Sequence, residues 1–570
     1  MTTVDESVHE SSAIRARTSL PALLAEWAAI LGDQRAVTYL DHAAGHEGVP
    51  VSWSWQELDQ RVSAVAAWVA SRVGRDERVA ILARQGLEYV AGFLGVLRAG
   101  AIAVPLFGPD LPGHTGRLTA VLADCRPSLA LTTRAELPGV TRFLGSATPV
   151  LAIDAIPPAV EHEHFHVDPD DLAYLQYTSG STRTPAGVMI THANVVANAR
   201  QGVTGYGLTT GRNCTVSWLP LFHDMGLVLS IAAPVVGGLR SVFMDPVAFI
   251  ERPERWLRAL SANPGAISAA PNFAYSYCAS RVDEHTKARL RLGTVHALIN
   301  GSEPVQPAAL ARFRTAFAAS GFRPEAQRCS YGLAEATVLV SVTPAGTPPR
   351  QTAFDRERLA GGVAIPVPGG TPLVSCGRPA DQQVCVVDPR TLRELPTGHV
   401  GEVWVSGDNV GVGYWGRPET SDDTFAAARA GEHRGHWLRT GDLGVLHEGE
   451  LYITGRIKDL VVVDGRNHYP QDLELTVEQA HPAIRPHNVA AFSVPGAEGE
   501  RVVVVAEKSR HVTEIDPVEV GMAVRTALSA EHGLSVREVF LLEPGGVSRT
   551  SSGKVSRSAC RARYLAGEFA

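Results

Sequence analysis

The sequence predicts an α/β fold in which a large N-terminal domain of layered α/β sheets, with a β-rich subdomain, precedes a small α+β domain. Helical and strand-like apolar patterns alternate up to about residue 340, for example at 55–73, 78–83 and 87–99. This alternation is typical of parallel sheets covered by helices. After about residue 375, short strand-like runs follow one another between glycine and proline turns. A mixed pattern begins beyond residue 459.

Local patterns predict the elements in order. The apolar spacing at 55–73 and 87–99 is helical, and the continuous apolar runs at 78–83 and 101–105 fit buried parallel strands. Two further strands are expected at 171–177 and 187–190, with Thr191 as the cap of the next helix. The runs GEVWVSG, LYITG and DLVVVDG predict strands of the β-rich part. A strand at 502–507 and a helix at 516–532 are expected in the tail.

The bulk composition excludes several classes of protein. The chain has 570 residues, of which 45% are hydrophobic and 19% charged, with a net charge of −7. A nucleic-acid-binding protein would be strongly basic. The longest apolar run, at 226–239, is too short to span a bilayer, and the acidic N-terminus has no signal-peptide pattern. Seven scattered cysteines without a CxxC pair favour reduced thiols in the cytoplasm over disulfides or a zinc site.

A loop rich in hydroxyl groups separates the strands expected at 171–177 and 187–190. Its residues are Thr178, Ser179, Gly180, Ser181, Thr182, Arg183 and Thr184. Glycine lets the backbone approach a ligand closely, and main-chain N–H groups and hydroxyls donate to phosphate oxygens. We therefore expect a site for a polyanion, with a polar hairpin turn as the alternative. The loop is not a P-loop, because no Gly-Lys-Ser/Thr step has the required spacing.

Lysine is scarce in this chain, since only four of its 52 basic residues are lysines: Lys287, Lys458, Lys508 and Lys554. Arginine evidently serves most cationic positions. A retained lysine can therefore mark a place that needs a compact ammonium group on a flexible stem. Lys287 and Lys508 stand in no recognisable motif, and we expect both at the surface.

The loop at 178–187 resembles the phosphate-binding signature of the adenylate-forming superfamily. This superfamily includes acyl-CoA synthetases, luciferases and peptide-synthetase adenylation domains. Many members carry lysine in a Pro-Lys-Gly step where this chain has Pro185-Ala186-Gly187. The sequence Thr-Arg-Thr-Pro-Ala-Gly at 182–187 is instead similar to the corresponding motif of the fatty acyl-AMP ligases. The resemblance extends from about residue 20 to residue 565 and implies binding of ATP.

Two motifs resemble the adenine-binding part of the family. In Asn-Gly-Ser-Glu-Pro at 300–304, the resemblance implies that main-chain groups of Gly301 and Ser302, beside Glu303, meet the edge of the adenine. The motif that begins at Tyr331-Gly332 implies that Tyr331 stacks on the adenine face. Its acid, Glu335, would bind Mg²⁺ together with the phosphates. One protein carboxylate suffices, because Mg²⁺ retains phosphate and water ligands.

The remaining motifs supply charged groups. Asp442, in Arg-Thr-Gly-Asp-Leu, takes the family's ribose-binding place, and Arg456 assists it. Lys554, in a Gly-Lys step near the C-terminus, takes the place of the catalytic lysine, whose fixed charge offsets charge that develops in the transition state. The segment that contains His223 resembles a core motif of the family. The resemblance implies that His223 lies beside the substrate carboxylate and gates the acyl pocket. A half-buried histidine with a purely structural role is its alternative.

The resemblance also implies two domains that rotate about a hinge. We expect an N-terminal adenylation domain at 1–455 with the acyl and ATP pockets, a hinge at 456–459 that includes Lys458, and a mobile C-terminal α+β domain at 460–570 with Lys554.

The length of one segment favours the fatty acyl-AMP ligase branch. Between Thr337 and Ser375 the chain resembles that branch's insertion, which packs on the large domain and hinders the rearrangement that coenzyme A uses. An ordinary surface loop is the alternative. The expected reaction converts a fatty acid and ATP to acyl-AMP and pyrophosphate. The acyl group would pass to the phosphopantetheine thiol of an acyl carrier protein acting in trans, in lipid, polyketide or lipopeptide biosynthesis.

Two other functions stay open from the sequence: an acyl-CoA synthetase that uses free coenzyme A, and a non-catalytic homologue that binds acyl chains or nucleotides. Carrier proteins are typically acidic, so a basic patch near the C-terminus is a candidate docking surface for the carrier. Its residues would be Arg549, Lys554, Arg557, Arg561 and Arg563. The alternative is that these residues only pair with nearby acids or with the nucleotide.

Overall fold

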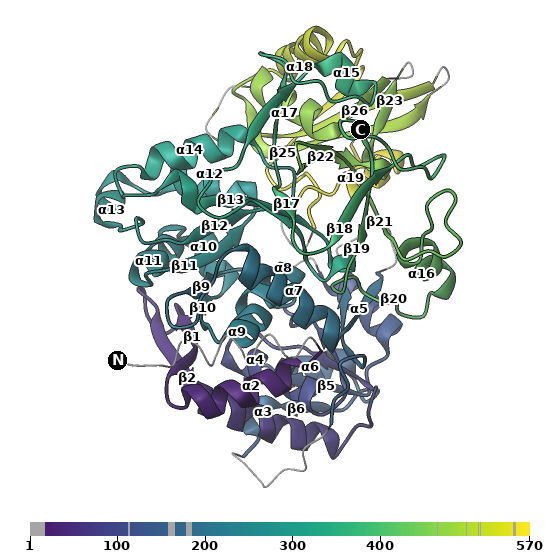
Figure 1. Cartoon of the computed structure of the whole chain (residues 1–570). Helices are drawn as coiled ribbons and strands as arrows, with labels where there is room; N and C mark the ends of the chain where they lie inside the picture. Colours follow the sequence, from purple (N-terminus) through teal and green to yellow (C-terminus); the bar gives the residue numbers. More distant parts are fainter. Residues whose placement is uncertain are drawn as a thin grey trace.

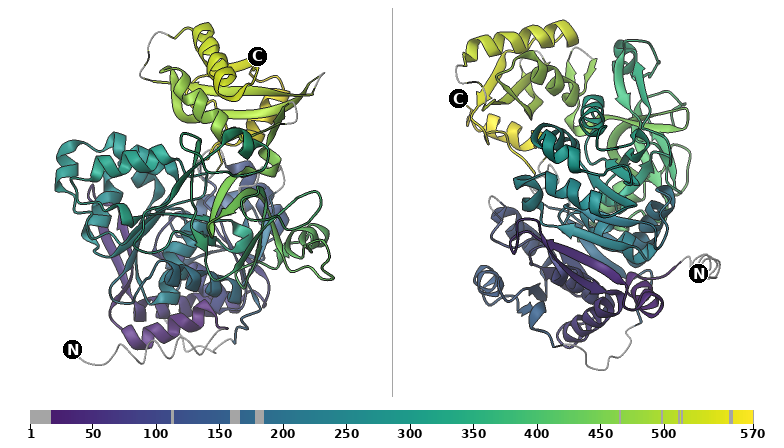
Figure 2. Two further views of the ribbon diagram at one scale, coloured as in Figure 1. Left: turned by 45° about the horizontal axis from the view of Figure 1, so that its top comes forward. Right: turned by 90° about the vertical axis from the view of Figure 1, so that its left-hand side faces the viewer.

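The computed structural model describes residues 17–111, 114–157, 166–177, 185–463, 466–496, 499–510, 512, 515–550 and 554–569. Helix α2 (Leu20–Leu31), the first helix that the structure describes, lies at one end of the molecule and the small C-terminal domain at the other, as Figures 1 and 2 show. The mixed α/β architecture with a large N-terminal and a smaller C-terminal domain confirms the predicted fold class.

Two large sheets form the N-terminal domain. The nine-stranded sheet has the order β17 (Arg378–Pro379), β14 (Leu339–Val342), β13 (Gln327–Gly332), β12 (Ala297–Asn300), β11 (Ala266–Ala270), β9 (Cys214–Ser217), β10 (Arg240–Met244), β1 (Arg35–Asp41) and β2 (Val49–Ser54). The seven-stranded sheet has the order β20 (Gly413–Tyr414), β8 (Gly187–Thr191), β7 (Leu172–Tyr177), β4 (Ile102–Pro105), β3 (Arg78–Ile81), β5 (Leu129–Thr132) and β6 (Val150–Ala152).

Helices cover both sheets. They are α2 (Leu20–Leu31), α3 (Trp55–Ala70), α4 (Leu87–Arg98), α5 (Thr115–Cys125), α6 (Leu137–Leu144), α7 (His192–Gly205), α8 (Asp224–Leu227), α9 (Ala233–Gly237), α10 (Pro246–Glu251), α11 (Glu254–Ala262), α12 (Asn272–Arg281), α13 (Glu284–Arg289) and α14 (Pro307–Phe317). A π-helical turn at Val228–Ala232 joins α8 to α9. Thr191 caps α7, as expected, through a reciprocal pair of bonds with Asn194.

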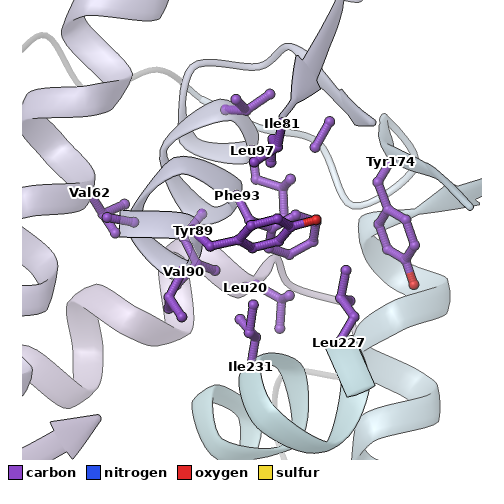
Figure 3. Packing of buried hydrophobic residues seen from close by; sticks show 14 of the residues in the cluster. Leu20, Val62, Ile81, Tyr89, Val90, Phe93, Leu97, Tyr174, Leu227 and Ile231 are labelled. Carbon is purple, nitrogen blue, oxygen red and sulfur yellow. The ribbon is translucent and has the colours of Figure 1, made fainter. Parts of the chain in front are cut away.

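The largest core cluster joins the helices to the seven-stranded sheet. Phe93 of α4 packs edge-on against Tyr174 of β7, with their ring centres 5.6 Å apart. Leu227 and Ile231, from the apolar run at 226–239, lie against the same cluster (Figure 3). This run is therefore core, as predicted. No helix among the described ranges is long and apolar enough to cross a membrane.

The β-rich part is a four-stranded sheet in the order β18 (Gln383–Val387), β19 (Gly401–Ser406), β21 (Leu438–His447) and β22 (Glu450–Arg456). Helix α16 (Pro418–Phe425) packs beside it. The segment between Thr337 and Ser375 forms a small hairpin of β15 (Gln351–Phe354) and β16 (Thr371–Val374), with α15 (Arg356–Ala360) between the strands. Its Phe354 is fully buried against Tyr452 of β22.

The elements after β22 lead into the smaller C-terminal domain. A 3₁₀ turn at Ile457–Asp459 leads into the pair β23 (Val461–Val463) and β24 (Arg466–His468). The main sheet has the order β25 (Ile484–Gly496), β26 (Gly499–Lys508) and β27 (Glu538–Leu542). Helices α17 (Pro470–Ala480), α18 (Pro517–His532) and α19 (Arg557–Leu565) complete the domain.

Two expectations for basic residues need correction. Lys287 is buried rather than exposed, because its ammonium pairs with Glu284 one helical turn away at 2.7 Å. Arg557 does not join a surface patch, because its guanidinium turns inward to Glu474 at 2.6 Å and Asp459 at 3.2 Å. The other two arginines of α19 also have partners. Arg563 pairs with Glu568 at 2.8 Å, and Arg561 donates to the Ser493 carbonyl.

Candidate active site

One cavity of about 180 Å³ collects seven of the eleven predicted site residues that the structure describes. It opens where the carboxyl ends of β12 and β13, the start of α8 and the C-terminal domain meet. Seven predicted residues line it: His223, Ser302, Tyr331, Gly332, Glu335, Arg456 and Lys554. Behind them the lining becomes mostly apolar and includes Val228, Ile267 and Leu339. The cavity thus has a charged mouth and a long apolar interior.

The hairpin of β21 and β22 brings two of the predicted motifs together. Asp442 and Arg456 stand opposite each other in the register of this hairpin. Arg456 Nε lies 2.8 Å from one oxygen of Asp442, and the Tyr331 hydroxyl donates to the other oxygen at 2.7 Å. The Asp442 carboxylate raises the pKa of Arg456, so the guanidinium stays charged. Asp442 itself does not line the cavity; it holds two side chains that do.

Glu335 lies in a 3₁₀ turn, Ala334–Ala336, just after β13. The Tyr414 hydroxyl donates to its Oε1 at 2.8 Å. Burial raises the pKa of Glu335, and the bond from Tyr414 opposes this shift. The preceding Gly332 is required by packing, because a Cβ there would lie 1.5 Å from the Val338 carbonyl oxygen. The turn therefore fixes a carboxylate on the cavity wall.

Lys554 reaches the cavity from the C-terminal domain. The base of its loop is closed by two bonds: Thr550 N–H donates to the Lys554 carbonyl at 2.8 Å, and Ser556 N–H donates to the Ser548 carbonyl at 2.8 Å. Burial lowers the pKa of Lys554, while the charges of Asp224 and Glu303 oppose this change. The ammonium group is thus desolvated and faces two carboxylates across the domain boundary.

His223 lies at the start of α8, and its Nδ1 is 2.5 Å from Oδ1 of Asp224. Burial disfavours the Asp224 carboxylate, but the neighbouring His223 and Lys554 charges outweigh it and lower its pKa. Sequence reasoning missed Asp224 as a site residue. The sequence does show Asp224 directly after His223 in the motif, but only the fold brings the charge of Lys554 close to Asp224. The second missed residue, Tyr414, comes from a segment far along the chain.

The other predicted residues are placed as follows. Gly301 and Ser302 directly follow β12, and Ser302 adopts a left-handed conformation with φ of 74°. Glu303 does not line the cavity, and burial raises its pKa against the opposing charge of Lys554. Lys458 is exposed in the turn after β22. The loop residues Thr178, Ser179, Gly180, Ser181 and Thr182 lie outside the described residues.

The donor set fits a magnesium ion held mainly by phosphates. Within the described ranges no group of three or more His, Cys, Asp or Glu side chains could hold a metal. Glu335 provides a single carboxylate at the cavity wall, as Mg²⁺ sites with nucleotide phosphates require.

Comparison with known proteins assigns the family. The sequence profile of AMP-binding enzymes matches residues 24–415. The chain belongs to the AMP-binding enzyme family. A second profile, described as the AMP domain of Disco-interacting protein 2-like proteins, matches residues 458–570 of this AMP-binding enzyme.

Relatives of this AMP-binding enzyme carry two kinds of name. It is 42% identical to the long-chain-fatty-acid–AMP ligase FadD32 of Mycolicibacterium smegmatis, over 97% of this chain and 95% of the relative. It is also 42% identical to the long-chain-fatty-acid–AMP ligase FadD26 of Mycobacterium marinum, over 97% and 98%. FadD21 of Mycobacterium tuberculosis, named a putative fatty-acid–CoA ligase, is 42% identical over 97% and 99%.

Solved structures agree with the first kind of name. A structure from a study of fatty acyl-adenylate ligases of E. coli and L. pneumophila superposes with a TM-score of 0.85 at 31% identity, covering 96% of this chain and 98% of the other. A fatty acyl-adenylate ligase of L. pneumophila in complex with acyl adenylate and pyrophosphate gives a TM-score of 0.74 at 32% identity, with 97% of each chain covered.

Proposed function

We propose that this AMP-binding enzyme is a fatty acyl-AMP ligase, which activates a fatty acid with ATP and passes the acyl group to a carrier protein. The observation that carries the proposal is the cavity itself. Arg456, Glu335 and Lys554 line it together with a mostly apolar set of side chains that includes Val228, Ile267 and Leu339. A carboxylate at the mouth with its hydrocarbon chain inside would lie beside the triphosphate.

In the first half-reaction an oxygen of the fatty acid carboxylate attacks the α-phosphorus of ATP. A new P–O bond forms, the bond to the β-phosphate oxygen breaks, and pyrophosphate leaves. Lys554 faces the position where negative charge builds up, and its desolvated ammonium acts with little reorganisation. Asp442 would accept the ribose hydroxyls, and it keeps Arg456 and Tyr331 in place at the same time. Mg²⁺, held by Glu335 and the phosphates, would neutralise charge on the leaving group.

In the second half-reaction the phosphopantetheine thiol of a carrier protein attacks the acyl carbonyl. A thioester forms, the acyl–phosphate bond breaks and AMP leaves. His223 lies beside the place of the carboxylate, where its ring, paired with Asp224, can orient the carbonyl. We further propose that the enzyme works in the cytoplasm, because all seven cysteines are free thiols and buried.

Two contacts favour a carrier over coenzyme A as the acceptor. The Arg356 side chain of the insertion donates to the Glu531 carbonyl of α18, so it ties the insertion to the C-terminal domain. Tyr469, at the start of α17, joins the buried cluster of Phe354. Both contacts would resist rotation of the C-terminal domain away from the cavity mouth.

Mass spectrometry of reactions with ATP and a panel of fatty acids tests the proposal. We expect acyl-AMP and pyrophosphate without an acceptor, acyl thioester on a phosphopantetheinylated carrier, and little acyl-CoA. Acyl-CoA formed at a rate similar to that of carrier loading would assign an acyl-CoA synthetase instead. Absence of pyrophosphate with every acid would assign a binding protein without catalysis.

A further inference from the structure

The inner end of the cavity is polar. Thr215 and Ile267 line the cavity and pair with each other at the amino ends of β9 and β11. The charged lining residues lie at the opposite, carboxyl ends of the neighbouring strands β12 and β13. The Thr215 side chain is fully buried, and its hydroxyl has no hydrogen-bond partner among the residues that the structure describes. An apolar chain end would leave this hydroxyl unpaired.

Arg328 stands behind the same end of the cavity. On β13 it pairs in register with Ile299 of β12, and it precedes Ser330 by two residues, so all three side chains share one face of the sheet. Ile299 and Ser330 line the cavity. The Arg328 guanidinium lies 5.9 Å from the centre of the Tyr206 ring, which also lines it.

Burial of the Arg328 guanidinium costs folding free energy, because part of this cation lacks hydrogen-bond partners in the described residues. The residue is only 2% exposed, and within the described parts of the chain neither Nε nor Nη1 has a hydrogen-bond partner. Burial lowers the pKa of Arg328 for this reason. A buried cation with unused donors destabilises a fold, and a hydrophobic side chain of similar size would pack there more favourably. Groups with this property concentrate at sites that await a ligand.

Tyr206 links this cation to the cavity. Burial raises the pKa of the Tyr206 phenol, while the hydrogen bond with Ser330 and the charge of Arg328 oppose this shift. A cation next to the phenol makes its O–H a stronger donor. The inner end therefore offers the Thr215 hydroxyl and the Tyr206 phenol as donors, with the Arg328 charge behind the phenol, and an oxygen acceptor is the complementary group.

We propose that the preferred acid carries a hydrogen-bond-accepting oxygen at its distal end, which Thr215 and the Tyr206–Arg328 pair bind. This inference rests on the proposed ligase function and specifies its substrate class. A chain with a terminal hydroxyl, carbonyl or carboxylate satisfies donors that a methyl group leaves unpaired. Sites built to pair a substrate oxygen discriminate strongly against the analogue that lacks it.

The test compares straight-chain fatty acids with ω-hydroxy and ω-dicarboxylic acids of equal length, with pyrophosphate release as the readout. At the best chain length we expect kcat/KM for one oxygenated series to exceed that of the plain acids by about tenfold. A preference for either oxygenated series supports the proposal. Plain acids that react at least as well at every length overturn it while leaving the ligase function intact. Failure of all three series would instead contradict the ligase function.

Two variants locate the preference. Thr215→Val, which keeps shape and strand propensity, should lower the ratio of oxygenated to plain kcat/KM about tenfold. Ser276→Ala is the control, because it removes another buried hydroxyl without a partner in the described residues, from α12 and outside the cavity lining. A ratio that both variants change alike, or that Thr215→Val does not change, overturns the assignment of Thr215.

Arg328→Met separates a binding role from a structural one. If Arg328 serves the ligand, the variant should lower the same ratio and raise the melting temperature, because an uncompensated buried charge is removed. A lower melting temperature with an unchanged ratio would make Arg328 a structural residue and overturn its part in the proposal. If the variant does not fold, Thr215→Val alone decides.

Discussion

The two domains hold their parts of the active site in different ways. On the large-domain side Asp442 is bonded both to Tyr331 and to Arg456, the first residue of the expected hinge, and Tyr414 fixes Glu335. Lys554 comes from a loop of the small domain, and the charges of Asp224 and Glu303 act on it across the boundary. The large domain thus presents a fixed surface, whereas the position of Lys554 depends on how the small domain sits. Substitutions in the two regions should therefore have different kinds of effect on the reaction.

Lys554→Ala should produce the largest effect. It removes the cation that offsets charge in the transition state, so kcat for adenylation should fall on the order of a hundredfold or more while ATP still binds. Pyrophosphate release and ATP titration by calorimetry measure the two effects. Lys508→Ala is the control, because that lysine pairs with Glu543 at the surface of the same domain. Near-normal pyrophosphate release would remove Lys554 from the chemistry.

Asp442→Ala should act on the fixed surface and raise the KM for ATP, by about tenfold, more than it lowers kcat. The proposed ribose contacts exist before and during the reaction, which is the reason for this split. Tyr331→Phe is the matched control, since it deletes only the hydroxyl that donates to Asp442. Steady-state kinetics decide, and an unchanged KM for ATP in Asp442→Ala would contradict the ribose assignment.

The sequence predicted contacts within one short segment better than contacts between distant segments. Asp442 and Arg456 are joined by a short hairpin, so their order along the chain already indicates their contact. Thr191, the run at 226–239 and the strands around them follow from local patterns that packing does not override. The domain boundary at 455–459 and the individual roles of the site residues stay predictions.

Residues that depend on packing between distant segments were missed or misjudged. Tyr414 reaches Glu335 only because β20 pairs with β8 in the seven-stranded sheet. Arg328 lies next to Ile299 only because β12 and β13 pair in this parallel register. Lys287 was expected at the surface, but Glu284 and the Ala279 carbonyl accept from its ammonium and permit burial. The contacts of Tyr414 and Arg328 have no local signature, whereas Lys287 and Glu284 lie one helical turn apart on the same helix.

Arg356→Ala should loosen the small domain and raise acyl-CoA formation several-fold, because it removes the contact from the insertion to the Glu531 carbonyl. Deleting 352–367, the cruder test, would also remove the buried Phe354 and Leu359 and so disturb the core. Arg358→Ala is the control, because it lies exposed on the same short helix. Acyl-CoA yields that stay equal in both variants would show that coenzyme A is excluded elsewhere.

Asp472→Asn should change how the stability of the small domain depends on pH. Burial raises the pKa of Asp472, in the first turn of α17, to about 7, while the charge of Arg356 opposes this shift. Between the ordinary carboxyl pKa and about 7 the folded state holds a proton that the unfolded state has lost, so stability falls as pH rises through this window. The variant should therefore raise the melting temperature more at pH 8 than at pH 4. An equal gain at both values would contradict an ionising Asp472.

Arg561→Glu should give the smallest effect, a reduction of a few-fold in kcat/KM for the carrier. Of the predicted basic patch, Arg557 pairs inward and Arg563 pairs with Glu568, so Arg561 is the exposed cation best placed to meet an acidic partner. Adenylation should not change, because Arg561 does not line the cavity. Exposed charges are screened within about 10 Å at 0.1 M salt, so the loss should shrink as salt is added. Arg390→Glu, an exposed arginine of the large domain, is the control. If both variants slow transfer equally at low salt, net charge and not a docking surface on the small domain governs the encounter.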